Sequence, residues 1–344
     1  MVTNMRRSDD ALSAQPSILF ASTSAFADTQ SLRQRLTDAT MDTVAAVSAG
    51  GNQACARTSD GRVKCWGIKL LGSLGLEDTN HRRDEPDEMG MNLPFVDLGL
   101  VPGVTVTRIT TGEGHTCALA SDGRVKCWGF NGFGRLGLGD TSTRGDQPGE
   151  MGTNLPFVDL GLDPGVTVVK MSTGYRHTCV LTSDDRVKCW GGNSDGQLGL
   201  GDTKSRGGLA SQMGTGLPFV NLGLPVGEKP IDICARAFHM CAHTSSGHIK
   251  CWGRNAHGEL GLGDTNDRGD QAGEMGTSLP FVSLGLNVTA AAISGSRYSN
   301  CALLVGGSVK CWGDNANGRL GLGDAFNRGD DLDEMGDNLA TVEF

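Results

Sequence analysis

Paired Cys residues are the side chains of this chain with the clearest capacity for chemistry. A metal site is disfavoured, because no Cys-x-x-Cys motif occurs and each pair supplies only two ligands. The turn Ser121-Asp122-Gly123 would place Cys117 opposite Cys127 on a hairpin, close enough for a disulfide. Buried free thiols, which pack well in a hydrophobic core, are the interpretation we favour. The possible disulfides join Cys55 to Cys65, Cys117 to Cys127, Cys179 to Cys189, Cys241 to Cys251 and Cys301 to Cys311, with Cys234 left over as a small core residue.

Three His residues occupy matching places in the sequence and could in principle act as general bases. They are His115, His177 and His239, and Gln53 and Ser299 stand at the corresponding positions elsewhere. A side chain that recurs at a fixed interval and is then replaced by Gln or Ser is typical of a structural role rather than of a catalytic site. We therefore expect buried His side chains with backbone hydrogen-bond partners, and no catalytic residues.

The tripeptide Arg-Gly-Asp occurs three times, at residues 144–146, 268–270 and 328–330. Such a tripeptide can serve in cell adhesion, but Gly208 replaces the Asp in another unit. The pattern is therefore typical of a structural loop that has diverged among copies. We expect each Arg to contact a nearby carboxylate instead of an external receptor.

Carboxylates beside the same loop could in principle bind calcium, which prefers several oxygen ligands. Asp140, Asp146 and Glu150 are the candidates in the second unit. No Asp-x-Asp-x-Asp spacing is present, and Gly208 and Gln212 remove two of these carboxylates from the third unit. We therefore expect neither a metal site nor a cofactor.

A repeated unit centred on the tripeptide Cys-Trp-Gly must position these side chains. Its Trp recurs at intervals of 62, 62, 62 and 60 residues, a period typical of propeller blades or solenoid turns. In the second unit, residues 104–110, 116–119, 124–128 and 155–160 favour strands, with Pro156 near the start of the last one. Four short strands per unit predict a propeller blade. The structural Trp residues, which we expect in the core, are Trp66, Trp128, Trp190, Trp252 and Trp312.

The repeats divide the chain into a leader and an array. We expect residues 1–40 to be a disordered leader or a weak targeting segment. Asp9 and Asp10, which follow an early Arg pair, weaken the targeting alternative. The strand Thr43 to Ala49 could complete the last blade and close the ring. An open arc, or part of a larger propeller, is the alternative. The units of the array 41–344 span about 41–103, 104–165, 166–227, 228–287 and 288–344.

Three motifs recur through the units: His-Thr-Cys-Ala-Leu, Asp-Gly-Arg-Val-Lys-Cys-Trp-Gly and Gly-Arg-Leu-Gly-Leu-Gly-Asp-Thr. They resemble the repeats of the regulator of chromosome condensation family, and the resemblance covers residues 41–344. It implies an all-β fold, a β-propeller with five recognisable four-stranded blades where the family usually has seven. Relatives that sense ultraviolet-B light use Trp clustered at a dimer surface, whereas each Trp here lies in the motif common to all blades. The resemblance therefore implies core packing for these Trp residues.

The charge balance limits the class of partner. Thirty basic and 39 acidic residues give a formal net charge of −9, which argues against binding to a nucleic-acid backbone. No stretch of the sequence approaches a membrane span. Without a convincing secretion signal we favour a cytoplasmic location with reduced thiols. Secretion or organelle targeting is the alternative, and it would make the hairpin disulfides plausible.

Nothing in the sequence marks an enzyme. There is no Gly-rich phosphate loop opening a helix, and the units are too equal in length to hold a unit-specific insertion. We favour a protein-interaction scaffold with an unidentified protein partner. The resemblance implies an alternative, a guanine nucleotide exchange factor for a small GTPase, although the wedge-like hairpin of the family's founding member has no counterpart here. Candidate partner contacts, which inter-blade packing would also explain, are Phe130, Phe133, Tyr175, Arg176, Phe238, Arg297 and Tyr298.

Overall fold

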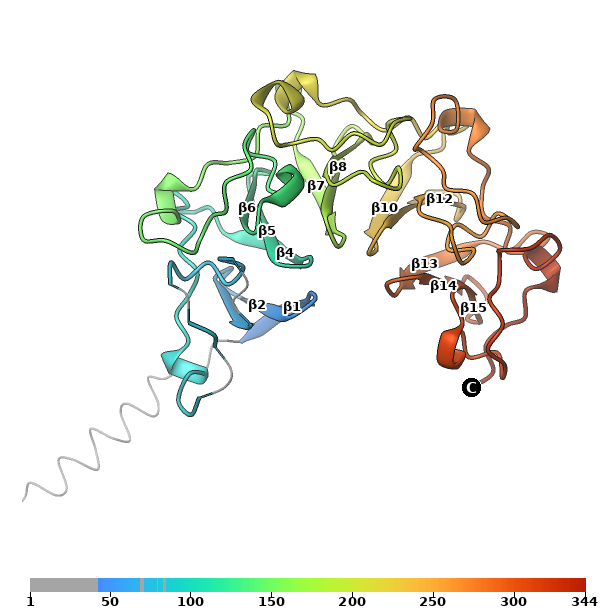
Figure 1. The fold of residues 1–344 in the computed structure, drawn as a ribbon, viewed down its shortest axis with the longest axis horizontal. Coiled ribbons are helices and arrows are strands. Elements are labelled where there is room, and N and C mark those ends of the chain that lie inside the picture. The colour runs from blue at the N-terminus through green and yellow to red at the C-terminus, as the bar shows by residue number, and fades with distance from the viewer. Residues whose placement is uncertain (1–42, 69–70, 79, 83–84) are drawn as a thin grey trace, which may run out of the picture. The chain divides into compact units, whose positions relative to one another are not determined.

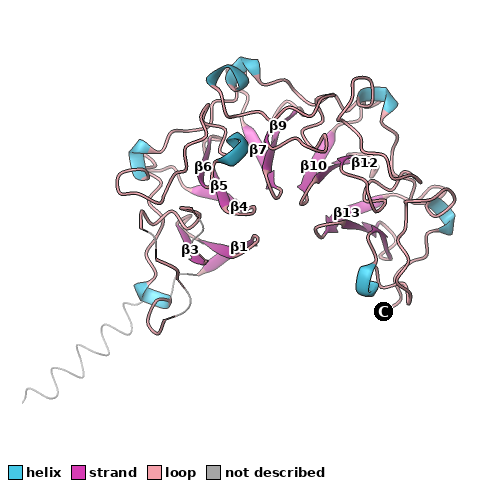
Figure 2. Cartoon of the chain, in the orientation of Figure 1, coloured by secondary structure: helices cyan, strands magenta, loops and turns pink. Residues whose placement is uncertain are grey.

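The computed structural model describes residues 43–68, 71–78, 80–82 and 85–344 and shows an all-β protein (Figure 1). Its strands form five antiparallel sheets, one per repeat unit, and short 3-10 turns lie in the connections (Figure 2). The expected all-β repeat fold is therefore confirmed. The strands are β1 (Val44–Ala49), β2 (Gln53–Thr58), β3 (Val63–Gly67), β4 (Val106–Thr111), β5 (His115–Ala120), β6 (Val125–Gly129), β7 (Val168–Thr173), β8 (His177–Thr182), β9 (Val187–Gly191), β10 (Pro230–Ala235), β11 (His239–Thr244), β12 (Ile249–Gly253), β13 (Ala290–Gly295), β14 (Ser299–Leu304) and β15 (Val309–Gly313). The 3-10 turns are η1 (Gly90–Asn92), η2 (Gly132–Gly134), η3 (Gly152–Asn154), η4 (Ala210–Gln212), η5 (Gly214–Gly216), η6 (Gly276–Ser278), η7 (Ala316–Gly318) and η8 (Gly336–Asn338).

Each sheet contains three strands that are neighbours in the sequence. In the second unit β5 pairs with β4 on one side and with β6 on the other, and Cys117 lies opposite Cys127 as the hairpin predicted. The turn between them contains Gly123 at a φ of 80°, a left-handed conformation that favours Gly. Asp185 adopts a φ of 64° in the third unit, because a short polar side chain tolerates that conformation better than most.

The outer segment expected to form a fourth strand does not join the sheet as a regular strand. In the second unit one backbone hydrogen bond, from Val158 N to Val125 O at 2.8 Å, connects this segment to β6. Pro156 has no N–H to donate, so a continuous ladder cannot form there. Over the described residues these segments contribute isolated bridges such as Lys188 with Phe219. The expectation of four-stranded blades is wrong in this detail.

The first strand belongs to the first unit, so the expected closure of the ring is wrong. β1 pairs with β2, placing Ser48 opposite Cys55. Within residues 44–344 the sheets follow one another along an arc, with the β1 sheet and the β13 to β15 sheet at its ends (Figure 1). Val47 of β1 is 72% exposed, whereas the corresponding Ile109 is 5% exposed. The array therefore has the open-arc arrangement.

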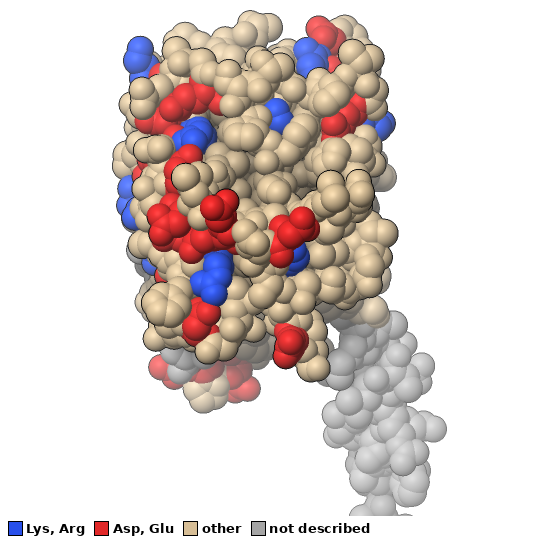
Figure 3. Space-filling view, turned by 90° about the vertical axis from the view of Figure 1, so that its right-hand side faces the viewer, with Lys and Arg blue, Asp and Glu red and all other residues tan. Residues whose placement is uncertain are grey.

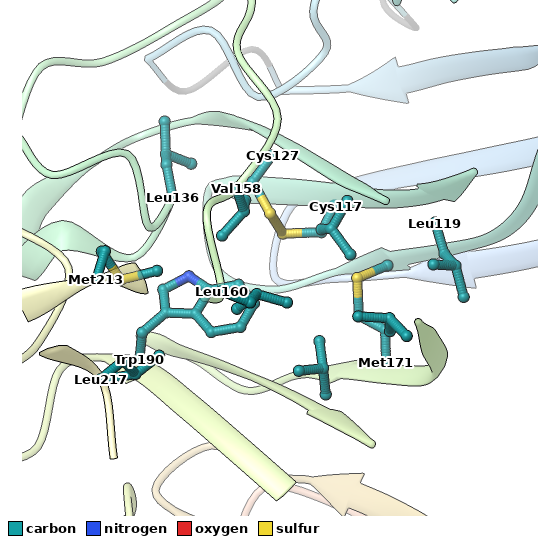
Figure 4. Packing of buried hydrophobic residues seen from close by; sticks show 13 residues of the cluster. Cys117, Leu119, Cys127, Leu136, Val158, Leu160, Met171, Trp190, Met213 and Leu217 are labelled. Carbon is teal, nitrogen blue, oxygen red and sulfur yellow. A yellow bond between two sulfur atoms is a disulfide. The ribbon is translucent and has the colours of Figure 1, made fainter. Parts of the chain in front are cut away.

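The hydrophobic core lies between neighbouring sheets. Between the second and third units, Cys117 and Leu136 belong to the same buried cluster as Met171 and Trp190 (Figure 4). The indole N–H of Trp190 donates to the backbone oxygen of Arg135 in the preceding unit, at 3.0 Å. Each unit therefore buries its Trp against the unit before it. The same indole contact recurs at Trp128, Trp252 and Trp312, all fully buried, whereas Trp66 of the first unit is partly exposed.

The Lys residue of the Lys-Cys-Trp motif is buried in four units, which the sequence alone did not indicate. The Lys126 ammonium group donates to the backbone oxygens of Leu98 and Gly152, at 2.6 and 2.9 Å. Burial lowers the pKa of this ammonium group. The side chain thereby ties its hairpin to the outer segment of the preceding unit, at Leu98, and to η3 of its own unit, at Gly152. Lys188, Lys250 and Lys310 make the equivalent contacts.

Candidate functional site: a platform of aromatic and arginine side chains

Aromatic side chains from three units meet at the inner bends of the array. Tyr175, Phe238 and Tyr298 follow the first strand of their units, β7, β10 and β13, and stand one or two residues before the next strand. The ring centres of Tyr175 and Phe238 are 5.4 Å apart, and those of Phe238 and Tyr298 are 6.3 Å apart. Equivalent bends of stacked repeats lie side by side, which brings these distant residues together.

Arginine side chains lie over the same rings. The guanidinium carbon of Arg297 is 4.8 Å from the centre of the Tyr175 ring and 5.1 Å from that of Tyr298. Arg254, which follows β12, lies 5.5 Å from the Tyr298 ring and 5.7 Å from the Phe238 ring. A cation held over an aromatic face contributes about 0.5–2 kcal/mol. These contacts therefore fix the positive groups beside the rings.

The second unit extends this set of contacts. Arg176 lies 5.4 Å from the ring of Phe133 and 5.9 Å from that of Tyr175, and Arg135 lies 4.6 Å from the ring of Phe130. Phe133 is 48% exposed. We call the whole set the platform: Phe130, Phe133, Arg135, Tyr175, Arg176, Phe238, Arg254, Arg297 and Tyr298. The structure thus brings together all seven sequence-selected contact residues and adds two that sequence reasoning missed: Arg135, which lies within a recurring motif, and Arg254, which directly follows one.

A hollow of about 560 Å³ opens beside the platform, where the inner bends of all five units converge. Arg236, Arg297 and Tyr175 contribute side chains to its lining, together with Glu113. Backbone hydrogen bonds join successive bends, from Glu113 N to Tyr175 O at 3.3 Å and from Tyr175 N to Ala237 O at 3.1 Å. Its lining residues are 49–52, 111–113, 173–175, 235–237 and 295–297.

Two ionisable platform residues have shifted pKa values. Desolvation lowers the pKa of the buried Arg135 guanidinium to about 10, with further lowering by the nearby Arg176. Arg135 donates to the backbone oxygens of Glu113 and Gly132, at 2.8 and 3.0 Å. A hydrogen bond to the Glu113 carboxylate raises the pKa of the Tyr175 hydroxyl. Arg135 thus stabilises the bend at Glu113 through its hydrogen bond to the backbone. The Tyr175 hydroxyl is hydrogen-bonded to the Glu113 carboxylate, the acidic side chain of the hollow.

The recurring His residues are fully buried between units. His115 Nε2 lies 3.1 Å from Thr178 Oγ1 of the next unit, and His239 Nε2 accepts from the Asn300 side chain at 2.9 Å. Burial lowers the pKa of His177 and of His239 to about 3, so both rings are neutral near pH 7. The partners of His115 and His239 are side chains of the following unit, not the backbone groups expected from the sequence, and both ring nitrogens of His177 are buried without a hydrogen-bond partner. This arrangement supports the structural role.

Each predicted Cys pair is joined by a disulfide across its hairpin, with Cα atoms 4.0–4.1 Å apart. The sulfur atoms of Cys179 and Cys189 are fully enclosed, since neither residue is exposed to solvent. Cys234 is the free cysteine of the described chain and is partly buried. The structure therefore contains the disulfide alternative, with every link inside one unit.

The Arg-Gly-Asp loops carry internal ion pairs. Arg144 binds Asp140 at 2.7 Å, and the Glu150 carboxylate accepts from the backbone N–H groups of Gly145, Asp146 and Gln147 at 2.8–3.0 Å. The corresponding Arg–Asp pair recurs in every unit. Among the described residues, no group of three or more His, Cys, Asp or Glu side chains could hold a metal ion. These carboxylates therefore organise their own loops.

Charge on the side of the array shown in Figure 3 is mixed, with acidic clusters beside scattered basic side chains. It offers no broad basic stripe of the kind that follows a nucleic-acid backbone. None of the helical segments in the described ranges is long and apolar enough to cross a membrane.

Comparison with known families identifies the repeat. A family model described as "Regulator of chromosome condensation (RCC1) repeat" matches residues 44–68, 106–135 and 168–197, and a second model with the same description matches residues 122–181. The matched segments contain β1 to β3, β4 to β6 and β7 to β9. The repeat recognised by these models is therefore the structural unit described above.

Individual proteins show the same likeness. The chain is 31% identical over 223 residues to the "Ultraviolet-B receptor UVR8" of Arabidopsis thaliana, covering 64% of this chain and 44% of the relative. It is 28% identical over 284 residues to "Protein pim1" of Schizosaccharomyces pombe, covering 81% and 48%. The chain thus spans less than half the length of each of these relatives. Among solved structures, human WBSCR16 matches with a TM-score of 0.51 at 16% identity, covering 88% of this chain and 82% of the other, which shows a shared fold.

Proposed function

Because the chain belongs to the family of proteins built from regulator of chromosome condensation (RCC1) repeats, we propose that it is a non-catalytic protein-interaction scaffold whose contact surface is the platform. Repeat arrays of this kind present broad, rigid surfaces on which a few aromatic and arginine anchors supply most of the binding free energy. Tyr and Phe are suited to this role because they bury a large area with few rotatable bonds, and Arg because its planar guanidinium group can form several hydrogen bonds and stack on rings.

One observation carries the proposal. Residues of four different units form a continuous set of ring and guanidinium contacts at the inner bends, and several of them remain open to solvent. Phe133 is 48% exposed at a φ of 67°, an unusual conformation for a bulky residue, and Arg297 is exposed. The left-handed turn recurs at Leu71 and Asn317, the equivalent positions of the first and fifth units, so it belongs to the repeat. The exposure of the Phe133 ring is the feature that a partner surface accounts for.

A protein capture experiment with the full chain tests this proposal. Wild-type protein, Phe133→Ala and the control Phe326→Ala would be used to retain proteins from a native lysate, followed by mass spectrometry. Phe326 is an equally bulky ring, 75% exposed, on a loop after the last hairpin and outside the platform. We expect Phe133→Ala to lose proteins that wild type and Phe326→Ala both retain. An identical set of proteins for all three would refute the platform as the contact surface.

The same experiment distinguishes the exchange-factor alternative. Recovery of a small GTPase that binds more tightly without nucleotide than with GDP or GTP would indicate an exchange factor. Recovery that is indifferent to nucleotide supports the scaffold.

A further inference from the structure

We propose that the platform and its hollow recognise an acidic segment of a partner protein, with Asp or Glu carboxylates bound by Arg236 and Arg297. This inference rests on the proposed function and names the chemistry of the partner. It follows from unpaired arginines, from a local opening of the backbone and from the charge of the rest of the molecule.

The arginines around the hollow lack acidic partners. Among the described residues, Arg176, Arg236, Arg254 and Arg297 have no carboxylate oxygen within ion-pairing distance. Most other described arginines form an ion pair, and the exceptions are Arg57, Arg108 and the platform residue Arg135. Paired arginines are Arg62, Arg82, Arg124, Arg144, Arg186, Arg206, Arg268, Arg319 and Arg328. The protein therefore concentrates uncompensated guanidinium groups at one place, where a carboxylate from outside would find favourable electrostatics.

Arg236 has more shielded, unpartnered nitrogens than the other three arginines. Its Nε and one terminal nitrogen are shielded from solvent and have no hydrogen-bond partner, while the other terminal nitrogen donates to Ala235 O at 3.3 Å. Leaving buried guanidinium donors unpaired costs free energy. A carboxylate can accept from two guanidinium N–H groups at once, in a charge-assisted geometry. Arg236 is therefore poised for a ligand that supplies oxygen acceptors.

Arg236 occupies a position at which the first three units have Gly against the backbone of the next unit. Gly112 and Gly174 stand at the equivalent positions, and a Cβ atom at either would lie within 2.4 Å of a backbone oxygen of the next unit. The junction between the fourth and fifth units differs. Among the described residues, the bend hydrogen bond that joins earlier units has no counterpart from Ala237 to residue 297. The bends of these two units are therefore separated enough to admit an Arg side chain.

The fifth unit completes this opening. A Cβ atom on Gly295 would lie 2.7 Å from Arg236 Nε, so the absence of a side chain at Gly295 leaves room for the guanidinium group. Arg297, two residues later, is exposed and also lines the hollow. Glu113 of the second unit is the acidic residue that lines the hollow. Its carboxylate already accepts a hydrogen bond from the Tyr175 hydroxyl. Arg236 and Arg297 thus border a hollow that is lined by one acidic residue, Glu113.

The rest of the molecule favours an acidic protein segment over a nucleic acid. With a formal net charge of −9, the chain would repel the repeated phosphates of a nucleic acid over most of its surface. A short acidic segment needs only the local positive groups. A hollow of about 560 Å³ bounded by backbone bends is also suited to one or two carboxylate side chains, with the aromatic rings contacting the adjacent backbone.

Fluorescence anisotropy with synthetic peptides tests the inference. The probe is a labelled eight-residue peptide in which Asp and Glu alternate with Gly and Ser, and its control has Asn and Gln in place of the acids. We expect the full chain to bind the acidic peptide, with weakening as salt rises, and to bind the amide peptide at least tenfold more weakly. Equal binding of the two peptides, or binding of neither, would overturn the inference.

Variants locate the binding site. Arg297→Gln alters an exposed side chain and should fold normally, and Arg236→Gln removes the buried donors. We expect each to weaken the acidic peptide about tenfold, while Arg124→Gln, which removes the same charge from a hairpin turn outside the platform, leaves affinity unchanged. Circular dichroism establishes that each variant is folded. Unchanged affinity in both platform variants, or equal loss in Arg124→Gln, would refute the assigned site.

These results remain distinct from a failure of the scaffold proposal. If Phe133→Ala loses protein partners but the acidic peptide does not bind, the platform stands and its acidic specificity is wrong. If the peptide binds through Arg236 and Arg297 while Phe133→Ala retains every partner, the acidic site stands and the platform proposal fails. Tighter binding of a single-stranded oligonucleotide than of the peptide would overturn the choice of a protein ligand.

Discussion

Arg297 of the fifth unit lies over the ring of Tyr175 of the third unit, with its guanidinium carbon 4.8 Å from the ring centre. The two residues are separated by the whole fourth unit in the sequence. Their contact exists because the inner bends converge, while the outer segments of the same units diverge along the arc. Contacts at the platform therefore link units that share no hydrophobic core cluster.

Tyr175 allows the ring and the hydroxyl of the platform to be separated. We expect Tyr175→Phe to retain partner binding, because the ring still contacts Phe238 and Arg297, whereas Tyr175→Ala weakens it about tenfold or more. Binding of the acidic peptide and of captured partners would be compared by anisotropy and pull-down. Equal loss in both variants would show that the hydroxyl contact with Glu113, rather than the ring, is required.

His177 should make stability depend on pH. Its pKa of about 3 in the folded state lies below the ordinary value of 6.5, so the unfolded chain binds more protons between these pH values. This His therefore lowers the free energy of unfolding as pH falls below about 6.5, and it has no such effect above that pH. We expect His177→Gln to reduce the loss of unfolding free energy on acidification, by up to about 1.4 kcal/mol per pH unit.

Urea titrations from pH 4 to pH 8 would measure this effect. Gln is a suitable replacement because Gln53 already occupies the equivalent place in the first unit, where it donates to Thr116 at 2.9 Å. Parallel stability curves for wild type and His177→Gln would contradict the low pKa of the buried ring.

The two classes of Trp predict different costs of truncation. Trp190 is fully buried against the preceding unit, so Trp190→Ala should lower the free energy of unfolding by about 3–5 kcal/mol. Trp66 is partly exposed at the end of the described array, and Trp66→Ala should cost clearly less. Urea unfolding followed by circular dichroism would compare them. A larger cost at Trp66 would indicate that another surface covers the first unit.

The Cys residues predict a simple chemical count. The chain has 11 Cys residues and the structure joins ten of them, so alkylation of denatured but unreduced protein should label Cys234 alone. Reduction before alkylation should raise the count to all 11. Mass spectrometry reads both numbers. Complete labelling without reduction would restore the interpretation of buried thiols.

Removing one link provides an independent stability test of the disulfides. The double change of Cys179 and Cys189 to Ala should destabilise the protein by roughly 2–4 kcal/mol under non-reducing conditions, since a short closed loop then opens in the unfolded chain. Cys234→Ala is the matched control and should have a small effect. The difference between them should vanish in reductant.

The sequence predicted the repeat and the hairpin register, and it placed the aromatic candidates in corresponding bends, because all three follow from periodic positions. Once Tyr175 and Phe238 were placed in equivalent bends, their proximity required only that the units stack. Arg236 was also visible in principle, as an Arg where Gly112 and Gly174 stand in earlier units. Its importance depends on the opening between two particular bends, which no local pattern reveals.

Other features depended on competition among contacts that the sequence does not rank. A strand beginning near Pro156 was a reasonable expectation, but Pro156 has no N–H to donate, and the hydrogen bond from Val158 N to Val125 O joins the segment to β6 without a continuous ladder. The first strand does not close the ring, since β1 pairs with β2 of its own unit as the edge strand of that sheet. β1 therefore pairs with its neighbour in the sequence and not with the fifth unit, as closure of a ring would require.

Every disulfide closes a loop inside one unit and none crosses from one unit to the next. Under mechanical tension the units could therefore separate one at a time, while each hairpin stayed tied. Paired Cys residues are ten positions apart in the sequence. The segment between them could not contribute to extension until the disulfide was reduced. Each oxidised unit would lengthen by about 35 Å less than a reduced one, so redox conditions would set how far the array can stretch.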